Sequence, residues 1–215
     1  RLASLGLDHV LTASALHNLG AVLSEMGDYA EGQRYLEQAR AVMRKVLNSR
    51  DPMVIRTVSA LGLVRDKQGD PAGALALYRE AVRLQRNAFG SDHPDVGWFL
   101  MHAGRLECNM GRPNAARREL LEALRIQEKG LGPNHPELAE TLRSLAQVDA
   151  EAGSIDLALE RGARALEIQE RALGPSHPDI APTLAGLAQF RALRGDSAEA
   201  LELALRAAKI RADQL

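Results

Sequence analysis

Apolar and small residues recur along this chain with two periods. Over short distances, residues such as Leu138, Leu142 and Leu145 stand three or four positions apart, which is the spacing of one face of an amphipathic α-helix. Over longer distances the pattern returns every 42 residues. A glycine column and an alanine column show this period: Gly27, Gly69, Gly111, Gly153 and Gly195; Ala39, Ala81, Ala123, Ala165 and Ala207. A fixed period of this length indicates a repeat architecture.

A linker motif marks the repeat boundaries. It occurs as Phe89–Val96, Leu131–Leu138 and Leu173–Ile180, and its central part reads Leu-Gly-Pro-Asn-His-Pro in the second copy. Proline suits the first turn of a helix, because its missing N–H has no partner there. We therefore expect helices to start at Pro94, Pro136 and Pro178. The period predicts five repeats, with the first eight residues as the end of a preceding one: 1–8, 9–50, 51–92, 93–134, 135–176 and 177–215.

Each repeat reads as two helices in a hairpin, joined at the glycine column. The middle of the first helix carries a small residue in every repeat: Gly20, Gly62, Gly104, Ala146 and Ala188. A glycine inside a helix costs about 1 kcal/mol relative to alanine, so this column predicts close contact between the two helices. One hairpin cannot bury its apolar stripe alone, whereas stacked hairpins can. The sequence thus predicts a single all-α array, an open α-solenoid.

The repeat resembles the tetratricopeptide repeat in its 42-residue form, as in kinesin light chains and many bacterial multidomain proteins. The resemblance rests on Leu16-His-Asn-Leu-Gly20, Gly27 and Ala39 with the linker motif, and it covers essentially the whole chain. It implies a right-handed superhelix of five helix-turn-helix units. One column departs from the family, which usually has tyrosine there: Leu23, Arg65, Glu107, Asp149 and Arg191. We expect its charges either to pair between neighbouring repeats, for example Asp149 with Arg191, or to be solvated.

Composition argues against some classes of binding partner and indicates the cellular location. The chain has 215 residues, 27 basic and 28 acidic side chains and a net charge of −1, which argues against recognition of nucleic acid or an anionic membrane by bulk electrostatics. No signal peptide or membrane span is visible, and the one cysteine, Cys108, cannot form an internal disulfide. We expect a cytoplasmic protein. Because the chain starts inside a repeat, stops where another linker should begin and shows no capping helix at either end, we also expect a segment of a longer protein.

No motif for catalysis, a cofactor or a metal is present. The chain lacks a phosphate-binding glycine loop, His-Glu-x-x-His and paired cysteines. His9, His93, His135 and His177 stand in successive linkers, where we interpret them as helix caps. Cys108 is interpreted as a quiet thiol, since no activating base is evident. The sequence therefore predicts no enzyme.

In the resembled family the first helices line a concave groove that holds a partner segment. Residues in three first-helix columns vary between repeats, and we take this variation to indicate exposure. These columns supply the candidate partner-binding residues Arg56, Trp98, Met101, Arg105, Arg143 and Gln147. Asn18 is added because it matches an asparagine that holds the bound peptide in some members of the resembled family, and Lys67 because it is a cation near the arginines. Trp98 is either an interface anchor or a packing residue, and the arginines are candidates for binding an acidic segment.

These features predict a scaffold that binds a protein or peptide segment, as the recognition or regulatory part of a larger signalling or transport protein. The alternative is a module that self-assembles or docks within its own chain through uncapped solenoid ends. The first reading predicts a monomer and the second predicts stacking.

Overall fold

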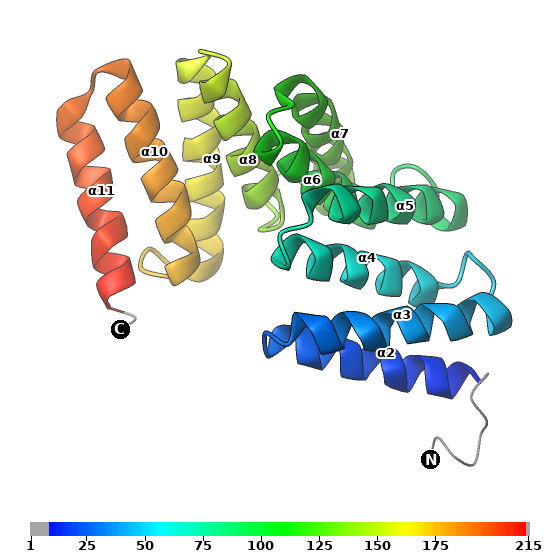
Figure 1. Ribbon diagram of the computed structural model, residues 1–215. Coiled ribbons are helices and arrows are strands. Elements are labelled where there is room, and N and C mark those ends of the chain that lie inside the picture. Colours follow the sequence, from blue (N-terminus) through cyan, green and yellow to red (C-terminus); the bar gives the residue numbers. More distant parts are fainter. Residues whose placement is uncertain (1–8, 214–215) are drawn as a thin grey trace. The chain divides into compact units, whose positions relative to one another are not determined.

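The computed structural model describes residues 9–213, which form ten α-helices, one 3₁₀ helix and no strand (Figure 1). The predicted all-α helical repeat fold is confirmed. The chain divides between Leu106 and Glu107 into two compact units, which are considered separately. The predicted repeat end at 1–8 lies outside the described residues.

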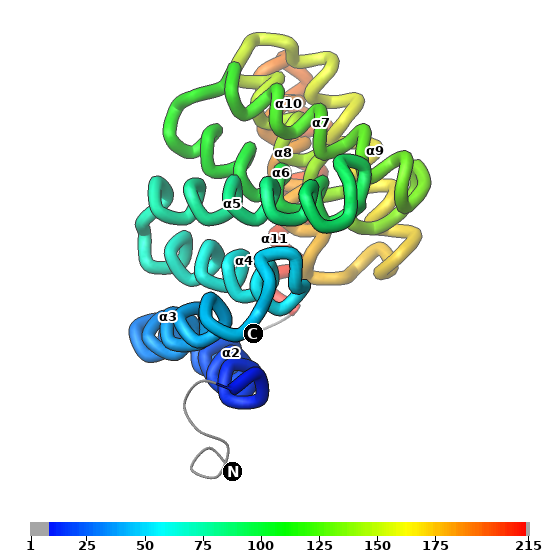
Figure 2. The backbone as a smooth tube through the Cα atoms, turned by 90° about the vertical axis from the view of Figure 1, so that its right-hand side faces the viewer, coloured from blue at the N-terminus to red at the C-terminus, as the bar shows by residue number. Residues whose placement is uncertain are grey.

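Unit 1 consists of helical hairpins with short turns. Its helices are α2 (Val10–Glu25), α3 (Tyr29–Val46), α4 (Pro52–Lys67), α5 (Pro71–Phe89) and the larger part of α6 (Pro94–Asn109). α2 packs on α3 and α4 on α5, and each pair runs antiparallel (Figure 2). α3 packs in turn on α4. The α2–α3 hairpin is therefore covered by the α4–α5 hairpin, as stacking of repeats requires.

Unit 2 repeats this arrangement. It contains the end of α6, then α7 (Pro113–Leu131), α8 (Leu138–Glu151), α9 (Ile155–Leu173), η1 (Pro178–Ile180), α10 (Ala181–Arg194) and α11 (Ser197–Ala212). Hairpins α8–α9 and α10–α11 pack on each other through α9 and α10. Their joint is a cluster of apolar residues that includes Leu159, Leu187 and Phe190.

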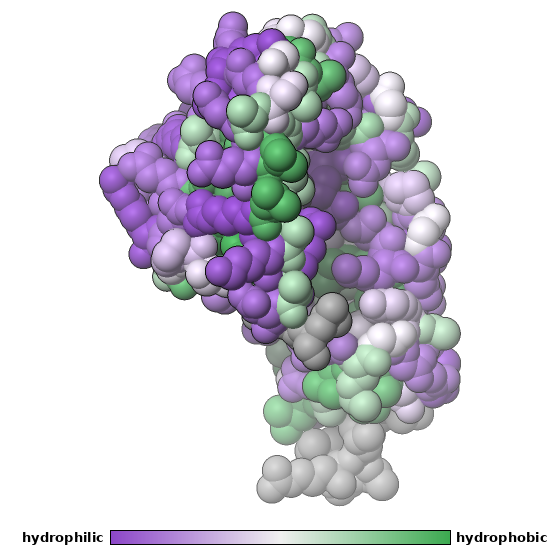
Figure 3. Space-filling view, turned by 90° about the vertical axis from the view of Figure 1, so that its left-hand side faces the viewer, coloured by the Kyte–Doolittle hydropathy of each residue, from purple (hydrophilic) through white to green (hydrophobic). Residues whose placement is uncertain are grey.

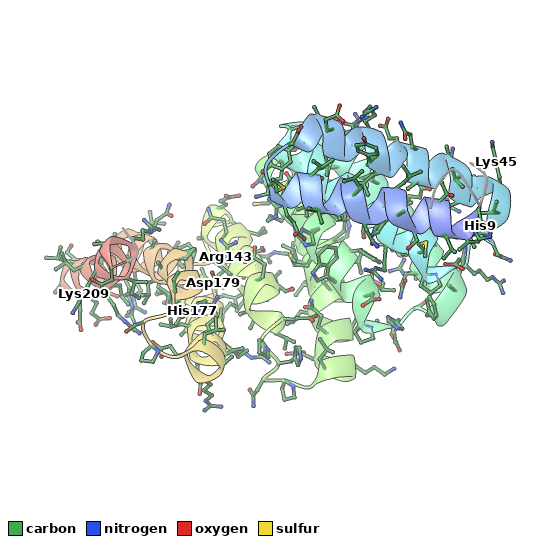
Figure 4. The ribbon with its side chains drawn as sticks, turned by 90° about the horizontal axis from the view of Figure 1, so that it is seen from below. His9, Lys45, Arg143, His177, Asp179 and Lys209 are labelled. Atoms are coloured by element: carbon green, nitrogen blue, oxygen red, sulfur yellow. The ribbon has the colours of Figure 1, made fainter. Side chains whose placement is uncertain are left out.

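The predicted capping by linker histidines is seen for His9 at α2, His93 at α6 and His177 at η1, whereas His135 accepts in the turn before α8, whose own N-cap Glu137 makes no side-chain cap. His9 Nδ1 accepts a hydrogen bond from the backbone N–H of Leu11 at 3.1 Å. His93, His135 and His177 each accept from the residue two positions on, at 3.2 to 3.3 Å. Figure 4 shows His177 beside Asp179, its donor. Since Nδ1 is the acceptor, these rings carry their proton on Nε2.

Two helix starts differ from the prediction. α6 begins at Pro94 as expected, but α8 begins at Leu138 and not at Pro136. In the last repeat Pro178 starts the 3₁₀ helix η1, and α10 begins at Ala181. Pro182 stands in the first turn of α10, where its missing N–H costs nothing.

The linker between α3 and α4 has a different backbone from the later ones. α5, α7 and α9 are each followed by a glycine with a φ near 90°: Gly90, Gly132 and Gly174. Such a φ favours glycine. α3 is followed by Leu47 with φ −121°, in an extended conformation. Asp51 replaces histidine as the cap and accepts from the N–H of Met53 at 2.9 Å.

The small-residue column brings helix backbones together most closely in the first hairpin. A Cβ atom added at Gly20 of α2 would lie 2.8 Å from the carbonyl oxygen of Gly32 on α3. At Gly62 the same atom would meet only the ring of Tyr78, at 3.3 Å or more. The predicted reason for the column, close helix contact, is confirmed at Gly20.

Candidate partner-binding surface

An apolar cavity lies on the first helices of unit 1. Its volume is about 460 Å³. Ala21 and Ser24 of α2 and Leu63 and Val64 of α4 line it, with Tyr29 and Leu36 of α3 at its base and Glu25 and Lys67 adding charge. Leu63 is 40% exposed. The cavity thus offers an apolar recess with charged groups beside it, which is the usual make-up of a ligand pocket.

Three of the sequence-predicted residues lie on this side of unit 1. Asn18 of α2 and Arg56 and Lys67 of α4 are exposed. Within residues 9–213 their side chains form no hydrogen bond or ion pair. Lys67 lines the apolar cavity, whereas Arg56 lines a smaller recess of about 130 Å³ beside Phe89 and His93.

The other predicted cations already have carboxylate partners. Arg105 of α6 forms an ion pair with Asp66 of α4. In unit 2, the half-buried Arg143 of α8, labelled in Figure 4, donates to both oxygens of Glu140, at 3.0 and 2.5 Å. Gln147 donates to Glu151 at 2.9 Å. An acidic partner at Arg105 or Arg143 would have to compete with these intramolecular carboxylates.

Variation between repeats does not always mark exposure. Met101 of α6 is only 5% exposed, and His17, in the same column, is buried and shares a 2.9 Å hydrogen bond with Thr57. Burial, and then the nearby charge of Arg56, lower the pKa of His17. The expectation of exposure was wrong at these two positions, because both side chains pack inside unit 1.

Trp98 belongs to an aromatic cluster within unit 1. Its ring centroid lies 4.0 Å from that of His102, 5.4 Å from that of Phe99 and 6.1 Å from that of Tyr78. His102 stacks on Tyr78 with centroids 4.9 Å apart. Of the two interpretations of Trp98, packing is the one with observed contacts.

His102 is held neutral by this cluster. Burial among the rings, and then the positive charge of Arg105, lower its pKa to about 4, from an unperturbed value near 6.5. Between these values the unfolded chain binds more protons than the folded chain. Stability is therefore lost as the pH falls through this window.

We expect His102→Phe to flatten this pH dependence while keeping an aromatic ring. From pH 7 to pH 5 the wild type should lose about 1–2 kcal/mol more unfolding free energy than the variant. Urea unfolding followed by the fluorescence of Trp98, the only tryptophan, measures the unfolding free energy of both proteins at each pH. Equal losses in the two proteins would assign the pH dependence to other groups.

The charged column is paired, but not as predicted for Asp149. Asp149 of α8 is fully buried, and its two carboxylate oxygens accept from Arg117 of α7 and Arg161 of α9. Arg191 instead pairs with Asp196 at 3.2 Å and Glu199 at 2.8 Å. The partners come from the second helices of the hairpins, because these helices flank the column on both sides.

Cys108 is unsuited to nucleophilic chemistry. Burial and the carboxylate of Glu151, 3.7 Å from Sγ, raise the pKa of the thiol to about 11. A thiol is nucleophilic only as the thiolate. This agrees with its interpretation as a quiet thiol.

Residues 9–213 contain no cluster of three or more histidine, cysteine or acidic side chains placed to hold a metal ion. Among the same residues, no helix has the length and apolar character needed to cross a membrane.

Comparisons with known proteins agree with the repeat architecture. A family model described as "Tetratricopeptide repeat" matches residues 11–87, 95–170 and 150–213. No curated protein matches the chain. One similar solved structure is that of nearly identical TPR-like repeats of a putative kinesin light chain from Podosopora anserina, with 23% identity, a TM-score of 0.74 and coverage of 96% of this chain and 98% of that one.

Two further structures share the fold at lower identity. BtubC (BKLC) from P. vanneervenii is 18% identical, with a TM-score of 0.79 and coverage of 95% of this chain and 82% of that one. MamA is 17% identical, with a TM-score of 0.61 and coverage of 91% and 95%.

Proposed function

Because the chain belongs to the tetratricopeptide repeat family, we propose that it is a scaffold that binds an extended protein segment on the first helices of unit 1. Repeats of this family typically form non-catalytic scaffolds for protein interaction. The proposal for this surface rests on one observation, the apolar cavity between α2 and α4 with Lys67 beside it.

The cavity defines the chemistry of the segment. Its volume of about 460 Å³ accommodates an apolar side chain and part of its backbone, and burying such a side chain contributes about 1.5–3 kcal/mol. Lys67 has no carboxylate partner among the described residues, so an acidic residue next to the anchor finds a free cation. The partner is therefore a segment with an aliphatic anchor and an Asp or Glu that lies beside Lys67 and away from Glu25, the acidic residue of the same lining.

Selection from a library of random displayed peptides tests this. We expect the enriched peptides to share the aliphatic–acidic pair, and Leu63→Glu and Lys67→Glu each to weaken their binding at least tenfold in fluorescence polarisation. Leu121→Glu is the matched control, since Leu121 of α7 is a leucine of similar exposure, 42%, outside the cavity. Peptides that bind both cavity variants as tightly as the wild type would contradict the proposal.

A second candidate, self-assembly, is favoured by the apolar faces of the first and last described helices. Leu19 and Val22 of α2 are 43% and 51% exposed. Two of their repeat equivalents, Leu187 and Phe190, are buried against Leu159 of α9. Leu201, the equivalent of Leu159 on α11, is 61% exposed. Figure 3, viewed from the α11 side, shows hydrophobic surface among hydrophilic surface.

Stacking of α11 of one copy on α2 of a second copy would reproduce the α9–α10 joint. This head-to-tail contact predicts a mass that rises with concentration. Sedimentation velocity measures it, and Leu201→Glu should return the protein to a monomer. A mass independent of concentration in the wild type would exclude self-assembly.

A further inference from the structure

A second cavity lies between the second helices of unit 1, away from the residues that line the apolar cavity. It has a volume of about 640 Å³ and is bounded by α3, the α3–α4 linker and α5. Four arginines line it: Arg40, Arg44, Arg50 and Arg83. The only acidic lining residue is Glu80. With four arginines and one glutamate, the cavity lining has a formal charge of +3.

Only one of these arginines is neutralised. Arg40 donates to both carboxylate oxygens of Glu80, at 2.7 and 2.6 Å. Within residues 9–213 no hydrogen bond or ion pair engages the side chains of Arg44, Arg50 and Arg83. The three free guanidinium groups come from α3, the linker and α5, so they approach the cavity from three sides. Ser49 and Asn87 add a hydroxyl and an amide to its lining.

The equivalent sites in unit 2 are filled by the protein itself. Arg164 of α9 contacts Glu128 of α7 at 2.7 Å and donates to the linker carbonyl of Pro133 at 2.8 Å. Arg206 of α11 bonds in the same way to Glu170 and to the carbonyl of Pro175, at 2.5 and 2.7 Å. In both places one guanidinium closes the space between two second helices and the linker.

At the joint between α3 and α5, the two equivalent positions carry charges opposite to those in unit 2. Glu80 stands at the position of Arg164, two periods earlier, and Arg44 stands at the position of Glu128. Glu80 is hydrogen-bonded to Arg40, so Arg44 has no ion-pair partner among the described residues. Its equivalents Glu128 and Glu170 are paired with Arg164 and Arg206. The linker adds a further cation, since Arg50 stands where the later linkers have Asp92, Asn134 and Ser176. The joint between α3 and α5 therefore lacks the guanidinium group that closes the two joints of unit 2.

We propose that this cavity binds a phosphate monoester. Arginine pairs bidentately with phosphate oxygens, and a phosphate dianion offers three terminal oxygens to the three free guanidinium groups. A carboxylate offers one charge and two oxygens, and so engages fewer of them. The ester is carried either by a phosphorylated side chain of a partner protein or by a small phosphorylated molecule.

Isothermal titration calorimetry at low salt tests the site with three probes: inorganic phosphate, a short phosphoserine peptide and acetate. We expect saturable one-to-one binding of both phosphates and at least tenfold weaker binding of acetate. A peptide that binds more tightly than inorganic phosphate identifies a protein-borne ester, and equal affinities identify a free one. Absence of phosphate binding at millimolar concentration, or acetate binding of equal strength, would overturn the proposal.

Two sets of variants locate the binding. Arg50→Ser, which copies the linker residue Ser176, and Arg83→Gln should each weaken phosphate binding about tenfold. Arg125→Gln is the matched control, because Arg125 is the exposed equivalent of Arg83 on α7. Binding that is insensitive to the first two changes, or equally sensitive to the third, would show that phosphate binds elsewhere.

The double exchange Arg44→Glu with Glu80→Arg separates geometry from charge. It restores the arrangement of Arg164 and Glu128, so that a guanidinium at position 80 closes the cavity, while the net charge of the lining stays the same. We expect phosphate binding to fall at least tenfold with helical content unchanged by circular dichroism. Binding equal to that of the wild type would mean that only the charge of the region matters, and the site would be rejected.

Discussion

Asp149→Ala should destabilise unit 2 by about 3–5 kcal/mol. The wild-type carboxylate is fully buried and accepts from Arg117 and Arg161. Both arginine side chains are themselves partly buried. Removal of the carboxylate leaves two positive charges close together without a counter-charge, which costs more than the original pairs contribute.

Native-state hydrogen exchange, read on the amides of α8 and α9, measures the loss locally, because repeat arrays open in parts. Glu167→Ala is the control: it breaks the exposed pair between Glu167 and Arg171 of α9 and should cost no more than about 1 kcal/mol. Similar effects of the two substitutions would show that burial of Asp149 adds nothing to the pairing.

Gly20→Ala should destabilise the first hairpin by up to about 2 kcal/mol, although alanine is the better helix former. The new Cβ atom would meet the Gly32 carbonyl oxygen and the Leu36 side chain, both at 2.8 Å. A backbone oxygen moves only if the two helices separate. Such overpacking costs about 1–3 kcal/mol, which outweighs the gain of about 1 kcal/mol in helix propensity.

Gly62→Ala is the matched comparison at the same repeat position. Its Cβ atom would meet the edge of the Tyr78 ring at 3.3 Å, and a small tilt of the ring relieves that contact. We expect a change within about 1 kcal/mol by urea unfolding followed by circular dichroism. If the two substitutions had equal effects, the close backbone contact of Gly20 would not be the reason for glycine there.

The repeat period was sufficient to predict the order of the helices and several of their caps. Histidine and proline in the linkers and glycine after the helices act through local geometry, so their roles can be read from the sequence. The starts of α8 and α10 could not, because they lie at the buried residues Leu138 and Ala181, and burial depends on tertiary packing and not on the linker motif. The side-chain partners of Asp149 lie 32 and 12 positions away, and no local pattern reveals such pairs.

The candidate surface was predicted only in part. Lys67 was found, but the apolar cavity beside it is formed by residues such as Leu63 and Val64, which resemble core residues in the sequence. Met101 and His17 vary between repeats and are nevertheless buried. The cationic cavity was missed because its arginines lie on the second helices, where the resemblance predicts no partner contact. An exchange of charge between equivalent positions, Arg44 for Glu128 and Glu80 for Arg164, was the signal that could have revealed it.

The same exchange of charge limits which repeats can replace one another. At the two joint positions, Arg86 and Glu122 keep the polarity of Arg44 and Glu80, whereas Glu128 with Arg164 and Glu170 with Arg206 have the reverse polarity. Loss of repeat 135–176 would bring Glu128 opposite Arg206, and the charges would match. Loss of repeat 93–134 would bring Arg86 opposite Arg164, and they would repel. From the charges in the sequence we therefore expect the chain to tolerate loss of repeat 135–176 better than loss of repeat 93–134.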